Sequence, residues 1–255
     1  VRHMTQDTPR TIWTLTGKDA VSFLQGLVTN DLRPLEQGPG IVWAALLTPQ
    51  GKYLADFFVV RHEGGDLLLD IATRLAADTL RRLTMYRLRA DVQIAPSDLR
   101  LSRGLGTPPD RAFPDPRHPA MGWRRYATDM LVTPDVDWDA IRVGNLIPES
   151  GIELIPDDSY ILEAGFERLH GVDFRKGCYV GQEVTARMKH KTELRKGLVR
   201  VRVDGSAPAR TEITGQDGRP VGTLFTQSGG FGIAYLRHDR SDGIMMAGQA
   251  RLRVE

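Results

Sequence analysis

Residues 176–203 read KGCYVGQEVTARMKHKTELRKGLVRVRV, and the hydrophobic pattern of the chain changes within this stretch. Its first part sets a cysteine between two glycines and continues, at 184–189, into a run with helical character. Its last part, residues 198–203, alternates apolar and charged side chains, which is the period of a half-buried strand. We therefore expect one kind of structure before this stretch and another after it.

The chain before residue 176 mixes short strands with helices. Runs of β-branched, aromatic and other apolar residues predict strands at 11–16, 41–47, 53–61, 66–71 and 91–95. Apolar residues at helical spacing predict helices at 20–28, 73–87, 138–146 and 160–169. This mixed order predicts an α+β fold with an antiparallel sheet.

The chain after residue 195 carries short strand-like runs separated by glycine-containing turns, which predicts a small β-barrel. Residues 103–120 are rich in glycine and proline and indicate a connection. We therefore divide the chain into a first α+β region, the connection, a second α+β region with the cysteine stretch, and the barrel, at 5–102, 103–122, 123–194 and 195–255.

Composition excludes several classes of protein. The chain has 255 residues, is 41% hydrophobic and carries a net charge of +2 with both signs interspersed, which is not the footprint of a dedicated nucleic-acid binder. One cysteine excludes an internal disulfide framework and a cysteine-only metal or cluster site within one chain. No long apolar run and no signal-peptide core occur, which predicts a soluble, cytoplasmic protein without membrane contacts.

Cys178 has the surroundings of a reactive sulfur. Lys176 lies two residues before it, and the run at 184–189 places a helix N-terminus after it. A nearby cation and a helix N-terminus both favour the thiolate over the thiol. The alternative is that Cys178 is a small buried hydrophobe, the usual state of a free cysteine.

The segment Lys176-Gly177-Cys178-Tyr179-Val180-Gly181-Gln182-Glu183 matches every position of K-G-C-[YF]-x-G-Q-E. This motif resembles the signature of the YgfZ family, folate-binding proteins related to the aminomethyltransferase (T-protein) of the glycine cleavage system. Residues 16–31, 47–56 and 218–234 are similar to other parts of these proteins. The resemblance implies ferredoxin-like antiparallel α+β domains around a central folate-sized opening, followed by a small C-terminal β-barrel.

The resemblance also implies two functional carboxylates. Glu163 lies in Leu-Glu-Ala-Gly, similar to the T-protein segment whose glutamate holds the pterin. Asp56 resembles the T-protein aspartate that supports aminomethyl transfer, although the acidic neighbour usual there is Ala55 in this chain. The alternatives are a solvated helix residue for Glu163 and an exposed strand residue for Asp56.

The motif supplies further candidates for folate binding. Lys176 and Arg187 are expected to attract the glutamate tail, or to form only a solvated basic face. Tyr179 is expected to stack on an aromatic ligand or to fill the core. Gln182 is assigned to the site as part of the motif, and Glu183 either accepts hydrogen bonds there or caps the following helix. No histidine spacing around the cysteine matches a standard zinc pattern, so we expect no metal site.

The resemblance implies a tetrahydrofolate-binding accessory protein in the assembly or repair of iron–sulfur proteins. Its expected partners are folate or a derivative and iron–sulfur client or carrier proteins, with Cys178 exchanging a thiol or contacting a cluster. One cysteine cannot hold a cluster alone, so a partner would have to supply ligands. A folate-dependent aminomethyltransferase using Asp56 and a non-catalytic folate-binding scaffold are the alternatives.

Overall fold

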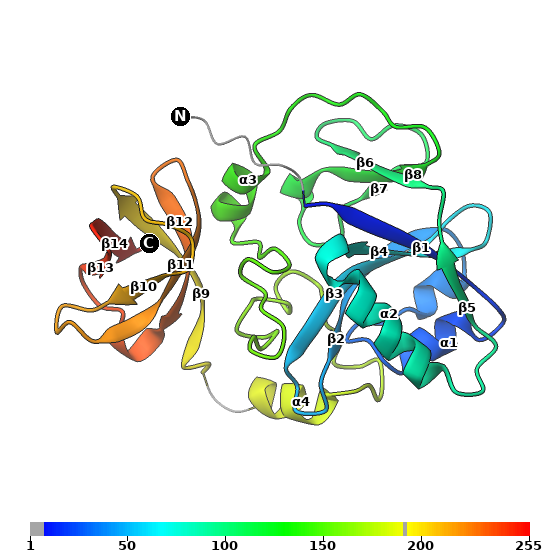
Figure 1. Cartoon of the computed structure of the whole chain (residues 1–255), viewed down its shortest axis with the longest axis horizontal. Helices are drawn as coiled ribbons and strands as arrows, with labels where there is room; N and C mark the ends of the chain where they lie inside the picture. Colours follow the sequence, from blue (N-terminus) through cyan, green and yellow to red (C-terminus); the bar gives the residue numbers. More distant parts are fainter. Residues whose placement is uncertain (1–7, 191–192) are drawn as a thin grey trace.

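The computed structural model describes residues 8–190 and 193–255. Figure 1 shows an α+β body on one side, a small barrel on the other, and a long irregular segment between them. Across the described residues, no helix combines the length and the apolar composition needed to cross a membrane.

The body is built on one antiparallel sheet with the strand order β2-β3-β4-β1-β5. Its strands are β1 (Arg10–Thr16), β2 (Gly40–Leu47), β3 (Tyr53–Arg61), β4 (Leu67–Ala72) and β5 (Gln93–Pro96). The central strands read as nearly continuous apolar runs because both faces of the sheet are covered, and β4 is buried along its whole length. The antiparallel sheet that the sequence predicts is confirmed.

Two α-helices and a short 3-10 helix accompany this sheet, namely α1 (Ala20–Gln25), α2 (Thr73–Arg87) and η1 (Arg33–Glu36). Leu24 of α1 and Leu83 of α2 are fully buried in the apolar core under the sheet. The opposite face of the sheet packs on the irregular segment, where Trp43 stacks on Phe166 with ring centroids 4.1 Å apart. The sheet is therefore held between two apolar layers.

The segment expected to be a plain connection contributes regular structure. A three-stranded sheet of order β6-β8-β7 spans it, with β6 (Arg100–Gly104), β7 (Phe113–Pro114), β8 (Trp123–Ala127) and the 3-10 helix η2 (Pro119–Met121). Gly122 has a φ of 65°, and a Cβ there would lie 2.0 Å from the Gly104 carbonyl oxygen. Glycine therefore allows the close strand contact that the composition indicated only as a loop.

The helix predicted at 160–169 is absent, and the helix at 138–146 is present as α3 (Trp138–Asn145). Residues 161–170 form successive turns. Gly165 has a φ of 82°, and the Phe166 amide donates to the Ile161 carbonyl, which winds the chain more loosely than a helix does. This path buries Phe166 against Trp43, so tertiary packing overrides the helical spacing of the sequence.

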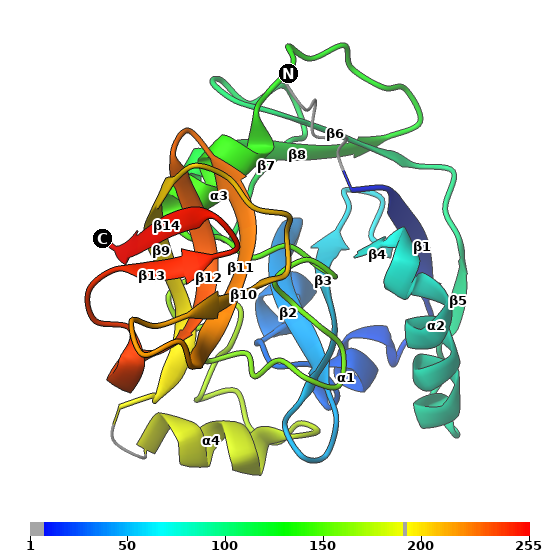
Figure 2. The same cartoon turned by 60° about the vertical axis from the view of Figure 1, so that its left-hand side comes forward.

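The helix after the cysteine motif is α4 (Gln182–His190), which lies beside the turn between β2 and β3 (Figures 1 and 2). A Cβ on Gly51 would lie 2.9 Å from Val184, and a Cβ on Gly181 would lie 2.6 Å from the Thr48 carbonyl oxygen. Both glycines have positive φ. The glycines of the motif and of the turn therefore let two backbones approach closely.

The C-terminal part is a closed barrel with the strand order β10-β11-β12-β9-β14-β13. Its elements are β9 (Lys196–Asp204), β10 (Thr211–Thr214), β11 (Pro220–Ser228), β12 (Phe231–Arg237), η3 (His238–Arg240), β13 (Met245–Ala247) and β14 (Ala250–Val254). Inward residues such as Val201, Ile213 and Leu252 fill its core. Closure removes free sheet edges, and the α+β fold with a C-terminal barrel is confirmed. The domain boundaries drawn from composition stay a prediction.

Candidate functional site

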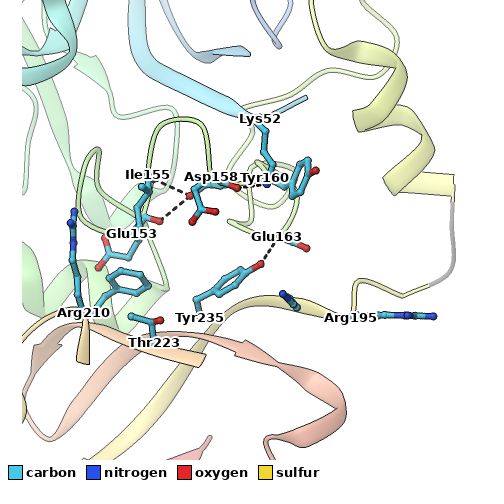
Figure 3. A pocket seen from close by; sticks show the side chains of 13 residues that line it. Lys52, Glu153, Ile155, Asp158, Tyr160, Glu163, Arg195, Arg210, Thr223 and Tyr235 are labelled. Carbon is cyan, nitrogen blue, oxygen red and sulfur yellow. Dashed lines mark hydrogen bonds between the residues drawn. The ribbon is translucent and has the colours of Figure 1, made fainter. Parts of the chain in front are cut away.

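A cavity of about 440 Å³ lies where the irregular segment meets the barrel (Figure 3). One wall comes from residues 153–163 and from Lys52 in the turn before β3, and the other comes from β11 and β12. The side chains lining it combine aromatic rings with groups of both charges, namely Lys52, Glu153, Ile155, Asp158, Ser159, Tyr160, Glu163, Arg195, Lys196, Arg210, Thr223, Phe225 and Tyr235.

Glu163 lies on the wall of this cavity, and its role in ligand binding stays a prediction. Its Oε2 accepts a hydrogen bond of 2.6 Å from the Tyr235 hydroxyl, which points across from β12 (Figure 3). Burial, together with this hydrogen bond and the charge of Glu163, raises the pKa of Tyr235 well above its usual value. The backbone carbonyl of Glu163 accepts from the Leu198 amide at 2.8 Å, so this residue joins the body to the barrel.

Cations surround the cavity from several elements. The Lys52 ammonium lies 3.8 Å from the centre of the Tyr160 ring and donates to the Asp158 carbonyl at 2.6 Å. Arg210, in the loop before β10, donates to the Gly151 carbonyl at 2.8 Å. Arg195 and Lys196 are exposed at the start of the barrel. The cavity therefore places the Glu163 carboxylate beside Tyr235, and the rest of its lining combines these four cations with the acidic Glu153 and Asp158.

A buried ion pair fixes the barrel against this cavity. Arg142 of α3 pairs with Glu153 at 3.0 Å and donates to the Thr226 hydroxyl of β11 at 2.9 Å. Thr226 in turn donates to the Glu153 carboxylate at 2.5 Å. Burial alone would lower the pKa of Arg142. The nearby carboxylates of Glu153, Glu149 and Asp139 have the larger combined effect and raise this pKa. Sequence reasoning missed this link, because no local spacing signals a contact across 84 positions.

Lys176 of the cysteine motif turns away from solvent. Its ammonium donates to the backbone carbonyls of Gln25 and Val28, at and just beyond the C-terminal end of α1. Burial lowers the pKa of Lys176 to about 8, with Asp31 and Asp173 acting in the opposite direction. Cations favour the C-terminal end of a helix. This contact ties the motif to the body, and Lys176 does not line the cavity.

The other motif residues divide between surface and core. Cys178 is exposed, in the loop before α4. Tyr179 is buried in the core, which is one of the two positions that the sequence left open for it. Gln182 and Glu183 begin α4, where the exposed Glu183 forms an ion pair of 2.8 Å with Arg187 one turn later. The motif residues lie outside the lining of the cavity, so the structure does not bring Cys178 and Glu163 into one pocket.

Asp56 is buried rather than exposed. Its Oδ1 accepts from the Tyr53 hydroxyl and the Ser150 hydroxyl, each at 2.6 Å, and its Oδ2 accepts from the Trp43 indole at 2.9 Å. Burial, and then the Asp56 carboxylate, raise the pKa of Tyr53 well above its usual value. Three protein donors thus occupy this carboxylate, which favours a structural role over proton transfer to a substrate.

A second buried charged cluster was also missed from the sequence. Asp70 pairs with Arg10 at 2.6 Å and with Arg124 at 2.5 Å, and Arg124 reaches Asp115 at 3.3 Å. Burial alone would raise the pKa of Asp115, but Arg117 and Arg124 lower it to about 2. The cluster joins the first sheet to the β6-β8-β7 sheet. It thereby holds the two layers of the body in one arrangement.

The fold and the barrel can be compared with known proteins. Residues 195–255 match the family model of the CAF17 C-terminal beta-barrel domain. The structure is similar to the glycine cleavage system aminomethyltransferase T of Bartonella henselae, with a TM-score of 0.76 over 97% of this chain and 83% of that one, at 12% identity. At this identity the likeness concerns the fold alone. The chain is therefore of the class that joins an aminomethyltransferase-like fold to a CAF17-type barrel.

The sequence relatives identify the family. The chain is 30% identical to the human iron–sulfur cluster assembly factor IBA57, mitochondrial, over 92% of this chain and 77% of the human protein. It is 32% identical to the Mycosarcoma maydis homolog over 72% of this chain and 53% of that protein. The Neurospora crassa homolog is 30% identical, with 80% and 55% covered, so the chain spans about half the length of these fungal relatives. The chain belongs to the IBA57 family.

The relatives bear on two expectations from the sequence, the family name and the cellular location. The resemblance pointed to YgfZ proteins, whereas the matching relatives carry the name IBA57. The predicted cytoplasmic location is wrong by the same comparison, because these relatives are named as mitochondrial proteins. The cytoplasmic prediction rested on the absence of a signal-peptide core, which does not exclude another compartment.

Proposed function

We propose that this chain is an accessory factor in the assembly or repair of iron–sulfur proteins. The observation that carries the proposal is the match to human IBA57 across 92% of this chain. A cell line that lacks its own IBA57-type factor tests this role, because the chain is expected to restore the activity of iron–sulfur enzymes there.

The ligand we propose for the cavity is tetrahydrofolate or a derivative. A reduced pterin presents an amine and a ring N–H on one edge, and a carboxylate can accept both hydrogens. Glu163 offers such a carboxylate, with the aromatic rings of Tyr160, Phe225 and Tyr235 around the same space. Arg195, Lys196 and Arg210 supply positive charge suited to the glutamate tail.

Cys178 takes a separate part in the proposal. Its exposure makes the sulfur accessible to a partner protein, at a surface that the folate cavity does not share. We propose that it contacts a cluster or a sulfur carrier held by that partner, which would supply the remaining ligands. Folate binding and thiol chemistry would then be separable by mutation.

Calorimetric titration with tetrahydrofolate tests the ligand. The expected result is one site per chain, with Glu163→Gln weakening binding by about 1.5–3 kcal/mol as a charged hydrogen bond is lost. Glu167→Gln is the matched control, because Glu167 is exposed and lies outside the cavity. Absence of binding to the unmodified chain, or equal losses in the two variants, would contradict folate as the ligand of this cavity.

A further inference from the structure

A second hollow, of about 200 Å³, lies on the outer surface of the barrel and is unrelated to the folate cavity. Outward side chains of β9 and β14 line it together with Ile244, just before β13. Figure 1 shows β13 and β14 on the side of the barrel away from the α+β body, and Figure 2 brings them forward. We call this surface the barrel arginine face, defined by Arg202, Arg251 and Arg253.

The arginines of this face are exposed and have no partner of opposite charge. The side chains of Arg202, Arg251 and Arg253 form no hydrogen bond or ion pair within the described part of the chain. Asp204 lies opposite Arg251 in the strand register but is not paired with it. Arg200, two residues earlier on β9, is different because its side chain pairs with Glu255 at 2.8 Å. The hollow therefore brings three arginines without an ion-pair partner among the described residues together on one surface of the barrel.

The strand register places two of these arginines opposite each other, where repulsion between like charges lowers the stability of the barrel. Arg202 of β9 and Arg253 of β14 are direct partners across the antiparallel pair. Like charges at directly opposed positions destabilise a sheet. The whole chain carries a net charge of only +2, with 34 lysines and arginines against 32 aspartates and glutamates. Such a local imbalance is what a surface built for a negatively charged partner presents before binding.

We propose that the barrel arginine face docks an acidic segment of a partner protein. Arginine guanidinium groups match carboxylates in a two-pronged geometry. Single exposed ion pairs are weak, so an open hollow of this kind favours a segment that brings several carboxylates over a lone small anion. The exposed side chain of Ile244 at the rim adds an apolar contact that a protein segment can use. This role does not depend on folate.

The test mixes the full chain with a short fluorescent peptide of glutamate, aspartate and leucine. Fluorescence anisotropy then measures binding at low and at physiological ionic strength. The peptide is expected to bind, more weakly at higher salt. The double variant R202E/R253E should weaken binding about tenfold or more. The double variant R219E/R240E is the control, because it makes the same change in charge at exposed barrel positions outside the hollow. It should change binding less than about twofold.

Three outcomes would overturn the proposal. The first is no peptide binding at low ionic strength, and the second is an equal loss of binding in the control variant. The third is competition by inorganic phosphate, single-stranded DNA or phosphatidylglycerol vesicles as effective as the peptide itself. A separate readout checks folding: Arg253→Glu alone should raise the melting temperature while weakening binding, because the introduced carboxylate would face Arg202. A lower melting temperature would contradict the argument from register.

Discussion

At the scale of single residues, the structure places the candidate residues from the sequence in different surroundings. The sequence suggests that Lys176 is a cation for a ligand or a thiol, yet its ammonium donates to two backbone carbonyls at and just beyond the end of α1. Asp56 reads as a catalytic carboxylate, yet three donors enclose it. Glu163 reads as a pterin acceptor and does line a cavity. Sequence identifies residues worth attention, but the direction of a side chain depends on packing against distant parts of the chain.

Asp56→Asn provides a prediction at this scale. The introduced NH2 group would take the place of one carboxylate oxygen and so face either the Trp43 indole N–H or the Tyr53 and Ser150 hydroxyls. We expect a loss of about 2–4 kcal/mol in the free energy of unfolding, measured by urea denaturation. Asp66→Asn, at an exposed loop position, should change it by less than about 0.5 kcal/mol. A different result would show a catalytic aspartate. In that case the unmodified chain would release ammonia in a transferase assay, and a stable Asp56→Asn variant would not.

At the scale of elements, the strands of the first sheet, α3, α4 and the barrel were predictable from hydrophobic period and turn residues. The missed elements share a physical reason. The strands at 100–127 are short and interrupted by proline and glycine, and the turns at 161–170 are set by burial of Phe166. The Arg142–Glu153 link to Thr226 depends on contacts between α3, the irregular segment and β11, which no local pattern records.

That link gives a prediction for the elements it joins. Glu153→Gln would leave the buried Arg142 with less compensating charge and weaken its contact with Thr226. We expect a loss of about 2–4 kcal/mol in the free energy of unfolding and faster proteolysis between body and barrel. The exposed Glu212→Gln on β10 serves as the matched barrel control. If the two variants were cut at the same rate, the link would not hold the barrel in place.

At the scale of the whole molecule, body and barrel form the two walls of the cavity that Glu163 lines, while Cys178 and the barrel arginine face lie outside it. The fold class followed from the sequence, because strand and helix periods and the motif resemblance agreed. The separation of the sites did not follow, because it depends on how the irregular segment coils between sheet and barrel. We infer that the cavity proposed to bind folate is separate from the two surfaces proposed to contact partner proteins.

The most direct test of this account measures iron–sulfur enzyme activity in cells whose own IBA57-type factor is deleted and which express this chain or its variants at equal level. The account predicts that the unmodified chain restores activity and that Cys178→Ala does not, while purified Cys178→Ala still binds tetrahydrofolate with unchanged affinity, because the sulfur lies outside the cavity lining. Failure of the unmodified chain, or full restoration by Cys178→Ala, would contradict it.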